Sequence, residues 1–108
     1  MPLIELTNAN FDQEIDLHAL AIFDFWAPWC APCKAFAPIF EAAAARHPEI
    51  LFARINTEDE PTLAKQFEVQ SIPTLIGAKD GTIVSVKLGA IPPAALEAMI
   101  DQLRKAVT

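Results

Sequence analysis

Short apolar runs alternate with segments of helical period along the chain. Residues 3–6 and 20–26 are apolar runs, and the second is interrupted only by Asp24. It lacks the alternation of a half-exposed strand, which is typical of a central parallel strand buried on both faces. We therefore expect strands at both runs, joined by a short helix that Thr7 or Asn8 caps.

The segment after the second run has the period of an amphipathic helix. Its apolar side chains recur at intervals of three and four, which places them on one stripe. The stripe consists of Cys33, Phe36, Ala37, Phe40 and Ala44. Pro38 lies inside this predicted helix and should kink it, because proline removes a backbone hydrogen bond. We expect the helix to run from Lys34 to His47, where the pair His47-Pro48 ends it.

The second half of the chain continues the alternation and adds a hairpin. Residues 50–55 predict a second buried strand, and the acidic run within 58–61 predicts a short helix with acids in its first turn. Residues 73–78 and 82–88 predict two strands joined by a tight turn. Pro92 should begin the last helix, whose buried face is expected to be Leu96, Met99, Ile100 and Leu103. The order β-α-β-α-β-α-β-β-α predicts a mixed sheet with helices on both faces.

The bulk composition narrows the class of protein. The chain has 108 residues, enough for one domain spanning 1–108 but not for two. Its net charge of −6 argues against a nucleic-acid partner. No apolar stretch approaches the ~20 residues of a membrane span. The start of the chain also lacks the basic and apolar regions of a secretory signal, so neither a membrane nor export is expected.

The motif that carries chemistry is Trp29-Cys30-Ala31-Pro32-Cys33-Lys34, which holds the only two cysteines. It lies where the central strand should pass into the helix. Backbone N–H groups and the dipole at a helix N-terminus stabilise a thiolate, and a thiolate is the species that attacks disulfides. Zinc is the alternative, but a closed zinc site needs about four ligands, and only His18 and His47 could add soft ligands. The motif therefore favours thiol–disulfide exchange.

Asp24 is the second telling residue, because a carboxylate inside an apolar strand costs free energy unless it is neutral or paired. Two interpretations remain open. A buried carboxyl with a raised pKa can act as a base at neutral pH, or Asp24 can be the structural partner of Arg54 in another strand. Arginine cannot give up its proton, so contact with Arg54 would hold Asp24 more firmly ionised.

These motifs in this order resemble the thioredoxin family over nearly the whole chain. The stretch 24–30 is similar to the family's active-site strand and loop, and Ser71-Ile72-Pro73-Thr74 to its cis-proline loop. Further matches are Lys34 with Ala37-Pro38, the turn Lys79-Asp80-Gly81 and the late Gly89. The resemblance implies an α/β thioredoxin fold, a central mixed five-stranded sheet flanked by four helices.

The resemblance also implies roles for individual residues. Cys30 should be the exposed nucleophile, Cys33 the buried resolving thiol, and Asp24 the acid that exchanges a proton with Cys33. The expected supporting residues are Pro32, Lys34, Arg54 and a cis Pro73. The expected substrate-binding residues are Trp29, Ile72, Thr74, Gly89 and Ala90, with Thr57 and Ser71 at the rim of the same groove.

The implied function is that of a general protein-disulfide reductase. The protein should need no cofactor or metal beyond its Cys30–Cys33 pair, and a separate flavin-dependent reductase using NADPH should recharge it. We expect a cytoplasmic monomer whose partners are disulfide-containing clients and a thioredoxin reductase. Two alternatives remain: a disulfide oxidase or isomerase of an exported compartment, and a binding module of the same fold without turnover.

The sequence departs from the family pattern at three places. Ala31 stands where most members have Gly, and Arg54 where many have Lys. The pair Gly77-Ala78 replaces two bulky apolar residues in a strand that should lie inside the sheet. Because interiors tolerate few voids, we expect Phe52 or Met99 to fill the missing volume.

Overall fold

The computed structural model describes residues 3–107, and its elements follow the predicted order. They are β1 (Leu3–Glu5), α1 (Phe11–Leu17), β2 (Leu20–Trp26), α2 (Ala31–Arg46), β3 (Leu51–Asn56), α3 (Pro61–Gln66), β4 (Thr74–Lys79), β5 (Thr82–Leu88) and α4 (Pro93–Lys105). No helix within the described range is long and apolar enough to cross a membrane.

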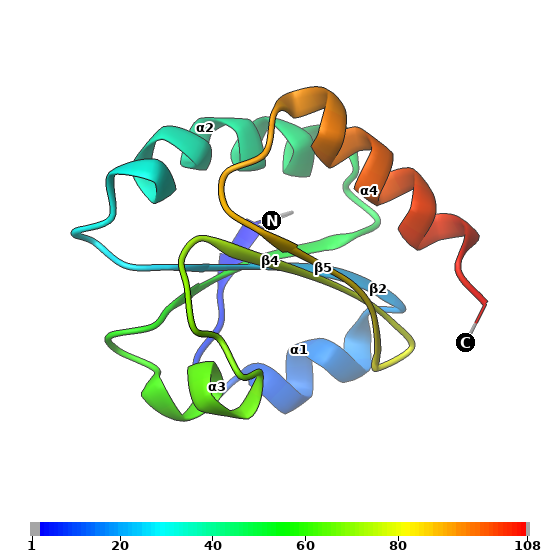
Figure 1. The fold of residues 1–108 in the computed structure, drawn as a ribbon. Helices are drawn as coiled ribbons and strands as arrows, with labels where there is room; N and C mark the ends of the chain where they lie inside the picture. Colours follow the sequence, from blue (N-terminus) through cyan, green and yellow to red (C-terminus); the bar gives the residue numbers. More distant parts are fainter. Residues whose placement is uncertain (1–2, 108) are drawn as a thin grey trace.

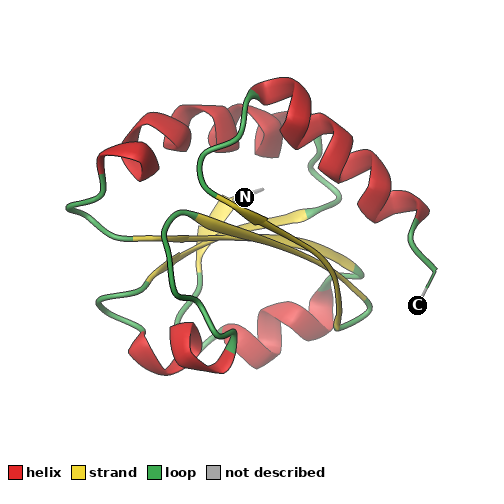
Figure 2. Cartoon of the chain, in the orientation of Figure 1, coloured by secondary structure: helices red, strands yellow, loops and turns green. Residues whose placement is uncertain are grey.

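The five strands form one mixed sheet in the order β1-β3-β2-β4-β5. β3 pairs in parallel with β1 and with β2, whereas β4 is antiparallel to both β2 and β5. Helices α2 and α4 cover one face of the sheet, and α1 and α3 cover the other (Figures 1 and 2). The predicted mixed sheet with helices on both faces is therefore confirmed.

The central position of β2 explains its unbroken apolar pattern. Residues 21–25 are all buried, because helices pack on both faces of the strand. One core, which includes Phe40, Phe52 and Met99, joins α2 and α4 to the sheet. The opposite core packs Phe23 against Phe67, whose ring centroids lie 5.7 Å apart. The two cores hold the carboxyl end of β2 in place, at the point where the chain turns into α2.

Several helix starts differ from the sequence prediction. α1 begins at Phe11 with Asn10 as its N-cap, because Thr7 and Asn10 first form a turn in which Asn10 Oδ1 accepts a hydrogen bond from the Thr7 amide at 2.7 Å. α2 begins at Ala31, three residues before the predicted start, since Cys30 caps it. The acidic run precedes α3 instead of occupying its first turn. Pro92 is the N-cap of α4, not its first helical residue.

The space beside Gly77 is filled by side chains from α4 and β5. A Cβ on this glycine would lie 3.4 Å from Met99 Cε, 3.6 Å from Leu103 Cδ1 and only 2.8 Å from Ser85 Oγ. The refilling by Met99 is confirmed, whereas Phe52 is not among the nearest groups. Ala78 lies on the other face, in the core with Phe23. Gly77 is therefore a close-packed position and not a void.

Substitution of Gly77 by alanine should destabilise the protein. The added Cβ meets the Ser85 hydroxyl below normal contact distance, and overpacking costs roughly 1–3 kcal/mol. Urea unfolding measures the change in the free energy of unfolding. The matched background is Ser85→Ala, which removes a buried hydroxyl that has no hydrogen-bond partner, and there Gly77→Ala should cost less. A gain in stability from Gly77→Ala alone, as chain entropy would give, would contradict the close packing.

Candidate active site

The two cysteines lie at the junction between β2 and α2. Cys30 is the N-cap of the 16-residue α2, and its sulfur accepts a hydrogen bond from the backbone amide of Cys33 at 3.2 Å. The two residues are joined by a disulfide, with their Cα atoms 5.3 Å apart. The structure is therefore the oxidised state. After reduction, the same amide and the dipole of α2 stabilise negative charge on Cys30 Sγ.

Cys30 is less exposed than the sequence suggested, and the expectation of an exposed nucleophile is wrong for this state. Cys30 is 5% exposed and Cys33 0%. The two sulfur-bearing residues pack with Ala27 in a small apolar cluster that Trp26 and Ile72 cover. Cys30 Sγ lies 3.9 Å from the carbonyl oxygen of Ile72. Cys30 is nevertheless the more exposed of the two cysteines, so it is the one that a reactant can approach.

The loop before β4 brings a distant segment against the dithiol. The Ile72–Pro73 peptide bond is cis, as predicted. The Gly89 amide donates a hydrogen bond to the Pro73 carbonyl at 2.8 Å, so the end of β5 is held beside this loop. Thr74 is buried, and its hydroxyl donates to the Ser71 carbonyl at 2.6 Å. The Thr74 hydroxyl thus stabilises the loop, and the binding of substrate by Thr74 stays a prediction.

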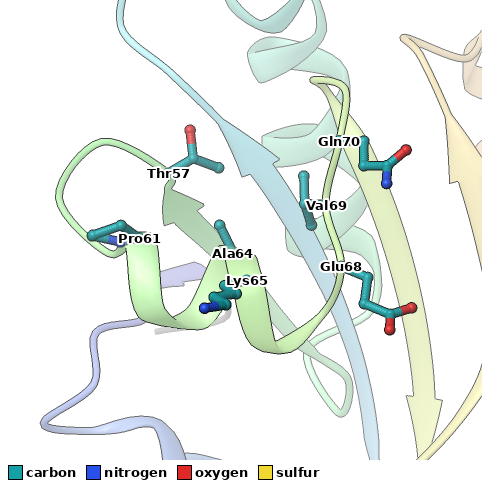
Figure 3. Close-up of a pocket in the computed structure, with 7 residues that line it drawn as sticks. All are labelled: Thr57, Pro61, Ala64, Lys65, Glu68, Val69 and Gln70. Carbon is teal, nitrogen blue, oxygen red and sulfur yellow. The ribbon is translucent and has the colours of Figure 1, made fainter.

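A pocket of about 210 Å³ adjoins the dithiol. Four of the predicted residues line it, namely Trp29, Thr57, Ser71 and Ile72, together with Ala64, Val69 and Gln70, which the sequence did not single out. Gly89 and Ala90 do not line it. A wider depression beside α3 shares four of its lining residues: Thr57, Ala64, Val69 and Gln70 (Figure 3). Nothing in the local sequence marks the extra residues, because only the packing of α3 and of the loop after it brings them to the site.

Trp29 carries the large apolar side chain of the motif, and the residue is 68% exposed. Its indole Nε1 donates a hydrogen bond to Glu58. The acidic run predicted only the start of a short helix, and nothing in the sequence marks this contact between Glu58 and Trp29. Glu58 thus orients the aromatic face that Trp29 presents beside Cys30.

Asp24 is completely buried, and neither of its carboxylate oxygens has a hydrogen-bond partner. Desolvation by burial raises its pKa to about 7, and it outweighs the opposing effect of the Arg54 charge. The negative charge of Glu5 raises the pKa further. Asp24 therefore gains and loses its proton near neutral pH.

Arg54 forms an ion pair with Asp24 but no hydrogen bond. The two residues are register partners on β3 and β2, and Glu5 is the register partner of Arg54 on β1. Arg54 Nε is 3.8 Å from Asp24 Oδ2, and the guanidinium lies 4.0 Å above the ring of Trp26. The stacking on Trp26 holds the cation beside the carboxylate without a hydrogen bond. The charge of Arg54 therefore offsets only part of the cost of burying Asp24, because desolvation has the larger effect on its pKa.

The other candidate residues lie outside this buried arrangement. Pro32 occupies the first turn of α2 and is exposed, as is Lys34. His18 Nδ1 lies 2.9 Å from the Glu14 carbonyl oxygen, and His47 Nε2 lies 2.8 Å from Glu97 Oε1. Within residues 3–107 no group of three or more His, Cys, Asp or Glu side chains could hold a metal ion.

Comparison with known proteins gives a consistent result. Residues 2–102 match the family model Thioredoxin. The chain is 44% identical to "Putative thioredoxin 2" of Streptomyces coelicolor over 94% of this chain and 76% of that protein, and 38% identical to the thioredoxin of Porphyra purpurea over 94% and 97%. Its structure is similar to that of mitochondrial thioredoxin 3 from Saccharomyces cerevisiae, with a TM-score of 0.84, 32% identity, and coverage of 93% of this chain and 94% of that one.

Replacement of Asp24 by asparagine should remove a pH dependence of stability. The pKa rises from 3.8 in the unfolded chain to about 7 in the folded protein. Between these values the folded state retains a proton that the unfolded state has lost, so stability falls as pH rises through this window. The loss amounts to roughly 4 kcal/mol at ~1.4 kcal/mol per pKa unit.

Urea unfolding between about pH 4 and about pH 8 tests this prediction. Asp24→Asn should flatten the curve and be the more stable protein at the upper end. The exposed Asp16→Asn is the matched control and should keep the wild-type slope. An unchanged slope in Asp24→Asn would show that the buried carboxyl does not titrate in this range.

Proposed function

The chain belongs to the thioredoxin family, and on that premise we propose how its residues divide the work of disulfide reduction. The family and the Cys30–Cys33 pair identify a thiol–disulfide oxidoreductase that acts as a protein-disulfide reductase. An oxidase or isomerase, or a module without turnover, is not favoured. The observation that carries the residue assignments is the position of Cys30 as N-cap of α2, bonded to the fully buried Cys33.

In the first step, the Cys30 thiolate attacks one sulfur of a client disulfide. A bond forms between Cys30 Sγ and that sulfur, the client S–S bond breaks, and the other client sulfur leaves as a thiolate that takes up a proton. The stabilised thiolate at the helix N-terminus supplies the nucleophile. The pocket beside Trp29 and the carbonyl of Ile72 supply the surface on which the client lies.

In the second step, Cys33 resolves the mixed disulfide. Asp24 accepts the proton of the Cys33 thiol, and the thiolate attacks Cys30 Sγ. The mixed disulfide breaks, the Cys30–Cys33 disulfide forms, and the second client sulfur leaves and is protonated. A base with a pKa of about 7 suits this step, because general-base catalysis is most effective near the operating pH. The client gains two electrons, which come from the dithiol, and two protons: Cys33 releases one through Asp24, and the solvent holds the one that Cys30 lost on becoming a thiolate.

The oxidised protein must then receive two electrons from a partner. We assign this role to a flavin-dependent reductase that uses NADPH, with no cofactor resident in this chain. A reducing compartment suits such a cycle, because cytosolic thiols are kept reduced, and on that ground we place the protein in the cytoplasm. We further propose that it acts as a monomer. Electron delivery to several clients would make it a contributor to cell redox homeostasis.

Single cysteine variants test the division of roles. Cys33→Ser retains attack but lacks the resolving thiol, so it should accumulate a mixed disulfide when it is mixed, in reduced form, with insulin. Cys30→Ser is the matched control and should form much less adduct, because Cys33 is buried. Non-reducing gels and intact mass measure the adducts. More adduct with Cys30→Ser than with Cys33→Ser would reverse the assignment.

A further inference from the structure

β5 carries an unusual set of exposed apolar side chains for the edge strand of a sheet. Ile83 is 49% exposed, Val86 52% and Leu88 70%. Single exposed apolar residues are ordinary, but three on one strand form a patch, and such patches mark interaction sites. No strand pairs with the outer side of β5 within the described residues.

A register shift places the three side chains on the same face of the sheet. Their partners on β4 are Ala78, Ile76 and Thr74 respectively, which alternate by two and so share a face. Ile83 and Val86 are three residues apart and would face opposite sides of a regular ladder. The pairing is irregular between Gly77 and Ala78, where β5 has one residue more than β4. The extra residue is Val84 of β5, and its insertion brings Ile83 onto the face that Val86 and Leu88 share.

This face forms one wall of a groove of about 590 Å³. The opposite wall is the segment that follows α3, and the apolar lining includes Phe67, Val69, Ile76, Ile83, Val86 and Leu88. Glu68 is the only charged residue that lines it. The groove thus suits an uncharged, apolar occupant.

The groove lies next to the pocket beside the dithiol, and the two share one wall. Val69, Gln70 and Ser71 line both. In Figure 3, Val69 lies on the side of the loop that faces Thr57, whereas Gln70 projects from the other side. The loop after α3 is therefore a shared wall, and a chain docked at Trp29 and Ile72 meets the second groove on crossing it.

We propose that this groove binds an extended apolar segment of the same client polypeptide whose disulfide reacts with Cys30. The assignment rests on the proposed function, since it extends the client surface at Trp29. A second copy of the chain is a poorer occupant, because each copy carries a net charge of −6 and like charges repel. The surface selects clients with apolar chain near the disulfide, which unfolded proteins expose.

The test compares two synthetic peptides with the same disulfide, one flanked on both sides by leucine and valine and the other by serine and glycine. The wild-type protein should reduce the apolar peptide with the lower KM. Ile83→Thr/Val86→Thr keeps β-branched residues in the strand and should raise KM for the apolar peptide about tenfold, as expected from losing a few buried methyl and methylene groups. The kcat/KM for the polar peptide should not change.

Lys87→Thr, on the same strand, is the matched control and should behave as the wild type. An unchanged KM for the apolar peptide in the double variant would overturn the proposal. The proposal would also be overturned if sedimentation showed a dimer for the wild type and a monomer for the double variant, because the face would then join two copies of the chain. Failure of the wild type to reduce the polar peptide would instead count against the proposed function.

Discussion

A carboxyl group buried without a hydrogen-bond partner is the constraint around which this site is built. Asp24 lies in β2, the central strand, and has no surface exposed to bulk solvent. Burial of the charged form costs free energy, so the protein holds Asp24 as an acid with a pKa of about 7. Arg54 could have neutralised it, but its guanidinium stacks on Trp26 and donates no hydrogen bond to the carboxylate. Burial of Asp24 thus lowers the free energy of unfolding at neutral pH, and it leaves the protein with a carboxyl group that changes its charge there.

The same strand delivers the dithiol. β2 passes through a short loop into α2, and that passage puts Cys30 at the helix cap and Cys33 inside the first turn. One feature of the backbone therefore sets both the nucleophile and the buried resolving thiol. The cis-proline loop and the segment after α3 are about 40 positions further along the chain, and they form the client-facing walls of the site.

Much of this could be predicted from the sequence, because the determining patterns are local. The unbroken apolar run of β2 predicts burial on both faces, and the stripe from Cys33 to Ala44 predicts α2. Helix caps were harder, since they depend on individual hydrogen bonds such as that from the Thr7 amide to Asn10. The low exposure of Cys30 depends on Ile72, which lies 42 positions away in the chain. Tertiary contacts of this kind leave no signal in a local pattern, and the register shift at Gly77 leaves only an unexplained glycine.

The central claim, that burial tunes Asp24 to titrate near neutral pH, is most directly tested by NMR. The carboxyl carbon of Asp24, assigned by its absence in Asp24→Asn, would be followed as a function of pH in the oxidised protein. We expect a titration midpoint near 7. A midpoint near the ordinary value of about 4 for an aspartate would mean that Asp24 is fully ionised at neutral pH, and the account of Asp24 as a base of matched pKa would be wrong.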